Sequence, residues 1–370
     1  MAAIEAGQFA AARDHLERAI QAGPPTPQLW LFLAQACVEL GDNDRAHDAL
    51  DEVLIAEPRG IYPLLMKGDL LAAAGDDRAA VSFYRMALSS AAGLSGIAPD
   101  LERRLAKAQS AIGAAERRFE THLTACLAEV GISEPPKRLA KALEIAAGKQ
   151  DVYLQQPTSF YYPELPQIAW YDPAYFDWVA AFEERVADMR AEVEAVLASG
   201  SGLTPYVEAD PNRPSRGHSL LGDENWSAFY LWKNGVRVDD HAKQCPVTME
   251  LLELPPIPKI KDRSPMAIIS VLAPGTHIPP HTGMLNTRLI CHVPLIVPTG
   301  CRLRVGGETR IVEEGKVLIF DDSIEHEAWN DGDRTRAILL FEIWRPELSE
   351  DERLSLVAMY EAIGSYPSAN

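Results

Sequence analysis

The second half of the chain contains the stretch MAIISVLAPGTHIPPHTGMLNTRLICHVPLIVPTGCRLRVGGETRIVEEGKVLIFDDSIEHEAWNDGDRTRAILLFEIW, residues 266–344. Short runs rich in β-branched residues alternate in it with turn signals such as Pro274-Gly275 and Gly306-Gly307. The runs predicted as strands are 266–273, 288–297, 301–305, 309–312, 317–320, 327–329 and 337–344. Short strands separated by regular turn signals predict an all-β barrel or sandwich.

Three histidines and one arginine of this stretch are candidates for a functional site. His281 and His326 are 45 residues apart, His292 lies between them, and Arg336 follows ten residues after the last histidine. Neutral imidazole is a good ligand for divalent iron, and a guanidinium matches a carboxylate with two parallel hydrogen bonds. The position two residues after His281 is Gly283, so a carboxylate ligand cannot come from there. Taken alone, the histidines could equally be polar residues of the barrel interior.

The segments around this stretch predict flanking elements of the same domain. Residues 155–173 are rich in aromatic residues and proline, and residues 177–197 have the periodicity of an amphipathic helix. Residues 226–232 alternate like a strand and lead into Asn234-Gly235, a tight-turn dipeptide. A surface helix is predicted at 347–363, so residues 151–370 are assigned to one β-rich domain.

The N-terminal part of the chain repeats with a period of 34 residues, up to about residue 93. Positions that share this spacing are Gly7, Gly41 and Gly75; Ala12, Ala46 and Ala80; and Leu16, Leu50 and Tyr84. Glycine permits the tight turn between two helices, and alanine lets the helices approach closely. A 34-residue period is typical of tetratricopeptide repeats, so an all-α solenoid is predicted for residues 1–115, followed by a helical linker at 116–150.

Stacked repeats of this kind form a concave surface that usually holds a peptide or protein partner. The simpler alternative is that the array only supports the domain that follows it. Both interpretations are open at the level of the sequence.

Composition limits the possible partners and compartments. The chain has 47% hydrophobic residues and a net charge of −18, which argues against nucleic-acid binding and against adhesion to anionic lipid. No stretch reaches the roughly 18 apolar residues of a membrane span, so stable membrane insertion is not expected. Five scattered cysteines without a CxxC pair are typical of reduced thiols in a cytoplasmic protein.

Four motifs of the C-terminal part resemble a known family. They are PGTHIPPHTG at 274–283, NTRLICH at 286–292, EEGKVLIFDDSIEHEAWN at 313–330 and WRPEL at 344–348. Together they closely resemble the aspartyl/asparaginyl β-hydroxylases, over about residues 157–350. The resemblance implies a double-stranded β-helix and an oxygenase that depends on iron(II) and 2-oxoglutarate. Family members also have Thr-Gly after the first histidine, hold iron with two histidines, and can carry tetratricopeptide repeats ahead of the catalytic domain.

The resemblance assigns a role to five residues of the predicted β-domain. His281 and His326 would bind the iron(II). Arg336, helped by the Ser270 hydroxyl, would bind the distal carboxylate of 2-oxoglutarate, and His292 would contact the carboxylate nearer the iron. The structural alternatives are a barrel-rim position for the two ligand histidines, an ion pair for Arg336, and buried hydrogen-bonded side chains for His292 and Ser270.

A departure from the family pattern concerns the substrate side of the site. Arg288 would contact the acidic side chain of the substrate, although it could also form an ordinary ion pair. The family usually has arginine where this chain has Ile290. The site is therefore one cation short, and Arg288 is the candidate to compensate.

Structural roles are predicted for several neighbouring residues. His277 is assigned a supporting role, and Asp321 and Asp322 are assigned to a turn at the end of a strand. Trp226, Phe229 and Trp232 are assigned to the core.

The function expected from the resemblance is a cytoplasmic iron(II)- and 2-oxoglutarate-dependent dioxygenase. It would use molecular oxygen to hydroxylate the β-carbon of an aspartate or asparagine in a peptide or protein, with the repeats presenting that substrate. One alternative is a non-protein target, such as a lipid acyl chain or a free amino acid. Another is a catalytically silent interaction protein, which Ile290 keeps open.

Overall fold

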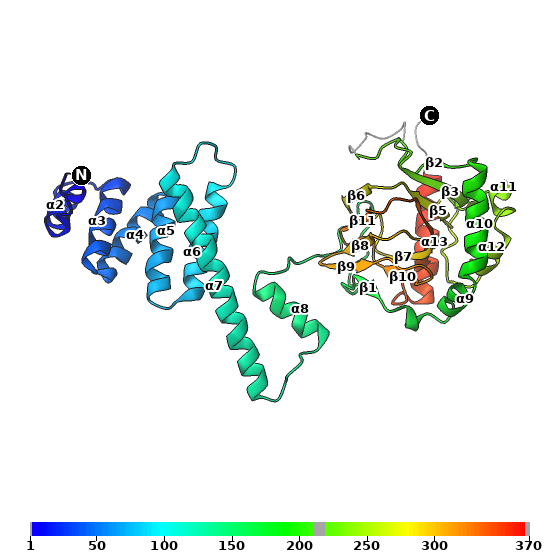
Figure 1. Cartoon of the computed structure of the whole chain (residues 1–370), viewed down its shortest axis with the longest axis horizontal. Coiled ribbons are helices and arrows are strands. Elements are labelled where there is room, and N and C mark those ends of the chain that lie inside the picture. The colour runs from blue at the N-terminus through cyan, green and yellow to red at the C-terminus, as the bar shows by residue number, and fades with distance from the viewer. Residues whose placement is uncertain (1, 210–218, 367–370) are drawn as a thin grey trace. The chain divides into compact units, whose positions relative to one another are not determined.

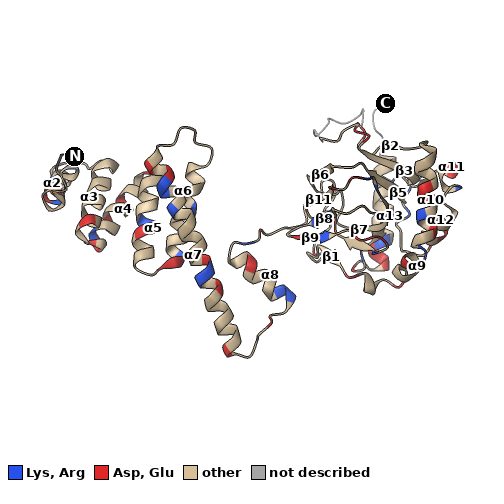
Figure 2. Cartoon of the chain, in the orientation of Figure 1, with Lys and Arg blue, Asp and Glu red and all other residues tan. Residues whose placement is uncertain are grey.

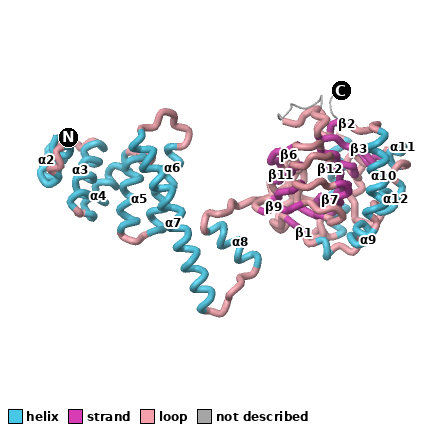
Figure 3. Tube along the Cα trace, viewed as in Figure 1, coloured by secondary structure: helices cyan, strands magenta, loops and turns pink. Residues whose placement is uncertain are grey.

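The computed structural model describes residues 2–209 and 219–366. The chain divides into two compact units, Met1–Gln150 and Asp151–Asn370, and each is described by itself. The first is helical, and the second combines strands with covering helices (Figure 3).

The first unit is an array of antiparallel helix pairs (Figure 1). Its helices are α1 (Ala2–Glu5), α2 (Phe9–Ala22), α3 (Pro27–Leu40), α4 (Asn43–Ala56), α5 (Ile61–Ala73), α6 (Asp77–Ala91), α7 (Pro99–Glu129) and α8 (Lys137–Ala146). The glycines between paired helices have φ of 72° at Gly41 and 84° at Gly75, the left-handed conformation that glycine adopts without strain. Asp42 and Asp76 follow them and cap the next helix through their side chains. The 34-residue prediction of tetratricopeptide repeats is confirmed.

Small residues let the paired helices approach closely. A Cβ atom added at Gly68 of α5 would lie 2.6 Å from the ring of Tyr84 on α6, so only glycine fits there. The Tyr84 hydroxyl donates a hydrogen bond to Asp69, 2.9 Å away. α7 continues unbroken through residue 116, so the predicted junction between 115 and 116 falls inside a helix.

The second unit is built on two antiparallel sheets. Its strands are β1 (Trp170–Tyr171), β2 (Thr204–Pro205), β3 (Trp226–Lys233), β4 (Val236–Arg237), β5 (Ala267–Leu272), β6 (Thr276–His281), β7 (Arg288–Ile296), β8 (Cys301–Val305), β9 (Glu308–Ile311), β10 (Leu318–Phe320), β11 (His326–Asn330) and β12 (Arg336–Trp344). The larger sheet has the order β1-β10-β7-β12-β5-β3-β2, with β4 paired to β3, and the smaller has the order β6-β11-β8-β9. This is the double-stranded β-helix that the family resemblance implied.

Helices cover the outer face of the larger sheet. They are α9 (Val179–Glu184), α10 (Val186–Ser199), α11 (Asp239–Ala242) and α12 (Pro246–Leu251). The last helix, α13 (Glu350–Ser365), packs in a separate cluster with Leu165, Ile260 and Trp344. Alternate residues of β12 point to opposite faces of the larger sheet. Leu339 and Phe341 pack against α9 and α10 in one hydrophobic core, whereas Ile338 and Leu340 pack between the two sheets in another. The space between the sheets is therefore walled by both of them, and the site lies there.

Two sequence predictions in this unit were wrong in detail. No strand was predicted between residues 274 and 287, where Pro279-Pro280 precedes His281, but Thr276–His281 is strand β6. β6 is the outer strand of its sheet, where proline is tolerated because the missing N–H leaves no partner unpaired. The helix predicted at 177–197 is divided at Arg185 into α9 and α10.

Across the described ranges 2–209 and 219–366, no helix is long and apolar enough to cross a membrane.

Candidate active site

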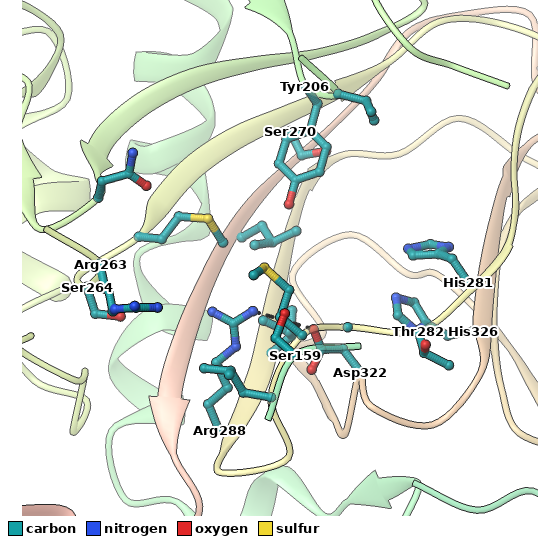
Figure 4. Close-up of a pocket in the computed structure, with 18 of the residues that line it drawn as sticks. Ser159, Tyr206, Arg263, Ser264, Ser270, His281, Thr282, Arg288, Asp322 and His326 are labelled. Atoms are coloured by element: carbon teal, nitrogen blue, oxygen red, sulfur yellow. Dashed lines mark ion pairs between the residues drawn. The ribbon is translucent and has the colours of Figure 1, made fainter. Parts of the chain in front are cut away.

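A cavity of about 1050 Å³ lies between the two sheets of the second unit. All six residues that the sequence nominated line it: Ser270, His281, Arg288, His292, His326 and Arg336. Figure 4 shows the histidine pair on one side of this space and Arg288 on the other, with Asp322 between them. Segments far apart in the sequence are thus brought to one cavity.

The histidine pair comes from neighbouring strands. His326 of β11 stands opposite His281 of β6, and the ring centroids are 4.1 Å apart. The Nδ1 atom of His281 lies 2.8 Å from the carbonyl oxygen of Pro279, and the Nδ1 atom of His326 lies 3.1 Å from that of Ile324. A carbonyl only accepts, so each Nδ1 carries the proton and the lone pair of each ring is on Nε2.

Burial keeps His326 neutral. Burial, together with the neighbouring His281, lowers the pKa of His326 to about 3. A neutral imidazole with its lone pair on Nε2 is the form that binds a metal ion. The electrostatics of the site therefore favour the ligand form over the charged form.

The residues around the pair fit a divalent ion held by two imidazoles. Within residues 2–209 and 219–366, no group of three or more His, Cys, Asp or Glu side chains is arranged to hold a metal ion. A Cβ atom at Gly283 would lie 2.0 Å from Oδ2 of Asp322, so no carboxylate side chain can extend from position 283. A site of this kind leaves coordination positions open, as an oxygenase needs.

Arg336 is a buried cation without a counter-charge. It is 2% exposed, its Nε atom makes no hydrogen bond, and no carboxylate of the described residues lies within ion-pair distance. Burial lowers the pKa of Arg336 to about 10, which still leaves the guanidinium charged near neutral pH. A desolvated positive charge that lines a cavity fits an anionic ligand, and the arginine fork fits a carboxylate.

Ser270 and His292 lie near this arginine on adjacent strands. Leu272, the register partner of Arg336, is two residues from Ser270, so Ser270 is on the same face of β5. The Ser270 hydroxyl accepts a hydrogen bond from Nε1 of Trp226, 3.2 Å away, and retains its own proton for a ligand. His292 packs edge-on against Phe320, and its pKa is lowered by burial and then by the neighbouring Arg336 and His326.

Arg288 is in the cavity but already paired. Its guanidinium forms an ion pair with the fully buried Glu342, and its Nη2 atom lies 3.8 Å from Oδ2 of Asp322 (Figure 4). Glu342 also accepts a hydrogen bond from Ser264. Ile290, two residues further along β7, lines the same cavity and is 5% exposed.

The roles predicted for Asp321 and Asp322 were incomplete. Asp321 is fully buried, 2.7 Å from Nη1 of the equally buried Arg345. Asp322 lines the cavity, and its pKa is raised to about 7 by burial, against the opposing effect of Arg288. The sequence signal for these buried charges is the position of two adjacent acids directly after the apolar run 317–320. A surface turn at the end of a strand requires only one acidic residue, so the second acid indicates another role. Nothing in the sequence pointed to Glu342 or to Arg345 as their partners.

The remaining neighbours have structural roles. His277 binds Glu327 at 2.8 Å and stacks on Trp329, outside the cavity. Phe229 belongs to the core, and Trp232 packs against it. Trp226 is buried and also lines the cavity, so the core assignment covers only part of its position.

Comparisons with known proteins agree with this geometry. Residues 183–346 match the family model for aspartyl/asparaginyl beta-hydroxylase, and residues 3–70 match one for the tetratricopeptide repeat. The human aspartyl/asparaginyl beta-hydroxylase is 31% identical over 93% of this chain, which spans 42% of that protein. An ornithine lipid ester-linked acyl 2-hydroxylase from Rhizobium tropici is 35% identical over 50% of this chain and 63% of its own length. The human aspartate beta-hydroxylase domain-containing protein 2 is 33% identical over 55% of this chain and 54% of its own length.

The tetratricopeptide-repeat model matches the first unit and the hydroxylase model matches the second, which is the order that the sequence predicted. His281, His292, His326 and Arg336 all lie within the residues that the hydroxylase model matches. The chain therefore carries a domain that matches the family model for aspartyl/asparaginyl beta-hydroxylase, preceded by a region that matches the tetratricopeptide repeat.

Proposed function

We propose that this protein is an iron(II)- and 2-oxoglutarate-dependent dioxygenase that hydroxylates the β-carbon of an aspartate or asparagine side chain in a peptide or protein. His281 and His326 would hold the metal ion, and Arg336 with Ser270 would bind the distal carboxylate of 2-oxoglutarate. His292 would lie beside the carboxylate nearer the metal.

The observation that carries this proposal is the pairing of two features in one cavity. Two adjacent imidazoles have their lone pairs on Nε2, and a buried guanidinium in the same space has no carboxylate partner among the described residues. A metal ligand set and an unneutralised cation are what a bound metal and a dicarboxylate require.

The side chains of this cavity would bind, orient and shield the reactants. When bound, iron(II) together with 2-oxoglutarate supplies the activation of molecular oxygen and the oxidising power for hydroxylation. Pro279 and Ile324 orient the two imidazoles through their carbonyl oxygens. Phe320 and Leu340 add apolar walls that keep water from the site.

The repeats support a peptide or protein as the substrate. Helical repeats of this type offer an extended surface for a partner, which a small metabolite does not need. Acidic and basic residues are interspersed along α4 to α7 (Figure 2), a pattern that suits a protein partner of mixed charge.

The direct test is succinate formation from 2-oxoglutarate by the purified chain with iron(II). Turnover should be abolished in His326→Ala and retained in His277→Ala, which changes an exposed histidine outside the cavity. Candidate substrates are then sought by mass spectrometry of proteins captured on His326→Ala, as species that gain one oxygen atom when the active protein is supplied. Equal succinate formation by both variants would refute the assignment.

A second candidate is hydroxylation of a lipid acyl chain. Ile290 and further apolar side chains, among them Met266, Met284 and Ile338, line the cavity, and a relative is named as an acyl hydroxylase. This candidate predicts turnover with acyl substrates in vesicles and none with peptides. A silent interaction protein would show neither metal binding nor saturable 2-oxoglutarate binding.

A further inference from the structure

The cavity holds two arginines in opposite electrostatic situations. Arg336 has no carboxylate within ion-pair distance in the described part of the chain, whereas Arg288 is paired with Glu342 and lies 3.8 Å from Asp322. Burial lowers the pKa of Arg336, but for Arg288 the two carboxylates outweigh burial and raise the pKa. The Arg336 end of the cavity therefore offers an unneutralised positive charge, and the Arg288 end does not.

The wall beside Arg288 is apolar. Ile290 follows two residues later on β7, so it faces the same side, and Ile338 of β12 also lines this space. A carboxylate placed here would lose its water without gaining an unpaired cation. It would also stand near the acidic groups of Glu342 and Asp322, which repel a like charge.

From these contacts, and resting on the proposed function, we infer that the reacting side chain is an uncharged carboxamide, that of asparagine, and that the aspartate carboxylate is selected against. Figure 4 shows Asp322 between Arg288 and the histidine pair. The specificity is set by the ion-paired Arg288 together with Ile290.

The pair Arg288–Asp322 matches the hydrogen-bonding groups of a carboxamide. Their side chains are 15% and 9% exposed, and they present a donor and an acceptor side by side. A carboxamide carries both complements, because its oxygen accepts from the guanidinium and its NH₂ group donates to the carboxylate. Once Asp322 is ionised, above about pH 7, a carboxylate has no donor for it and adds a second negative charge.

This selection applies to the reacting side chain and not to the whole substrate. Lys261 and Arg263 also line the cavity, and Figure 4 shows Arg263 beyond Arg288, away from the histidine pair. Acidic groups elsewhere on a peptide can pair with these two residues. The test must therefore vary the charge of one side chain alone.

The experiment compares two probes of equal size on the full chain loaded with manganese(II), a paramagnetic ion, and saturated with 2-oxoglutarate. The probes are N-acetyl-L-asparagine N-methylamide and N-acetyl-L-aspartate N-methylamide. The relaxation of the β-methylene protons reports how well each probe occupies the position near the metal. We expect an enhancement at least about tenfold larger for the asparagine probe, the size of one lost polar contact. An equal or larger enhancement for the aspartate probe, or none for either, would overturn the inference.

Two variants of Ile290 test whether this residue determines the preference for asparagine over aspartate. Ile290→Arg adds an unpaired cation and should raise the response of the aspartate probe by about tenfold. Ile290→Leu changes the shape of the wall without its charge and should keep the preference for asparagine. An aspartate response that stays unchanged in Ile290→Arg would overturn the assignment to this wall.

A separate measurement on the same samples shows whether the proposed function itself fails. The relaxation of water protons reports manganese binding before any probe is added, with His326→Ala as the negative control. If manganese does not bind, the proposed function fails. If manganese and 2-oxoglutarate bind and the aspartate probe is preferred, only the inference about the side chain fails.

Discussion

His326 stands directly opposite His281 in the ladder between β11 and β6, with ring centroids 4.1 Å apart. Directly opposed residues of an antiparallel pair point to the same face, so both imidazoles face the cavity. The register shifts between His326 and Ala328, so one extra residue of β6 is accommodated just beside the pair. Such irregularities often occur where a strand must aim a side chain at a site.

Removal of either imidazole should weaken metal binding strongly. We expect His281→Ala and His326→Ala each to weaken binding of iron(II), or of manganese(II) as a stable substitute, by at least about a hundredfold, because a single imidazole holds the ion poorly. Calorimetric titration measures this. The matched control is His277→Ala, which removes a half-exposed imidazole bound to Glu327 and should bind metal like the unchanged chain.

Replacement of Arg336 should affect ligand binding and stability in opposite directions. Arg336→Met should weaken 2-oxoglutarate binding by about a hundredfold, since a charge-assisted bidentate contact is lost. The same change should leave the melting temperature of the ligand-free protein equal or higher, because a buried unpaired charge is removed.

The control for Arg336 is Arg302→Met, which removes a partly exposed arginine paired with Asp331. It should leave 2-oxoglutarate binding unchanged. A drop of several degrees in the melting temperature of Arg336→Met would show that Arg336 supports the fold, contrary to its assignment as a ligand group.

The stability of the metal-free chain should depend on Asp322 through pH. Burial raises the pKa of this carboxyl to about 7, from an ordinary value of 3.8, with Asp321 and Glu342 adding to the rise against Arg288. A raised carboxyl pKa means that the folded state binds the proton more tightly. Its contribution is complete below about pH 4 and is lost as the pH rises through about 7.

Asp322→Asn imitates the protonated side chain and should remove this dependence. Compared with the unchanged chain, it should gain stability on the order of 2 kcal/mol on going from about pH 5 to about pH 8. Denaturant unfolding of both proteins at the two pH values measures the difference. A constant difference would mean that Asp322 is ionised in the folded state throughout this range.

The fully buried ion pair between Asp321 and Arg345 should be costly to break. Asp321 and Arg345 are both fully buried, and Asp321 also accepts from Gln155 and Ser323. Asp321→Asn leaves the guanidinium without its counter-charge and should cost about 3 kcal/mol or more. Asp240→Asn, which breaks an exposed pair with Lys243, should cost less than about 1 kcal/mol. Similar losses in the two variants, measured by urea unfolding, would contradict this ranking.

Two glycines of the repeat unit should respond to alanine with opposite signs. Gly68→Ala places a methyl group 2.6 Å from the Tyr84 ring and should destabilise the unit by about 1–3 kcal/mol through overpacking. Gly113→Ala meets only the end of the Arg117 side chain, 3.5 Å away, and should stabilise α7 by about 0.5–1 kcal/mol. Thermal unfolding followed by circular dichroism tests both, and a gain for Gly68→Ala would show that the helices can move apart.

Much of the fold could be predicted from the sequence because turns and single strands are determined by residues that are close together in the chain. The 34-residue spacing of Gly41 and Gly75 reflects turns that each repeat makes by itself, and the strands 301–305 and 288–296 are continuous runs between clear turns. β6 was missed because Pro279-Pro280 is read as a break, and only its place at the sheet edge makes it possible.

The identity of the cavity-lining residues could be predicted because they belong to recognisable sequence motifs. Their ion pairs could not be predicted, because these depend on which strands are neighbours. All six nominated side chains line one cavity, but the sequence left the partner of Arg288 undetermined. Glu342 lies 54 residues away from Arg288, and the pair forms only because β7 and β12 are neighbours in the sheet. Whether a charged residue is free or paired is a property of such non-local contacts.

The central claim is that His281 and His326 hold one metal ion beside an anion site at Arg336. Equilibrium dialysis of the full chain with iron(II) and labelled 2-oxoglutarate, under anaerobic conditions, tests it most directly. We expect one metal ion per chain, 2-oxoglutarate binding that strengthens at least about tenfold when the metal is present, and loss of both in His326→Ala. Stoichiometric metal binding that survives in His326→Ala, or 2-oxoglutarate binding that is indifferent to both the metal and Arg336→Met, would contradict it.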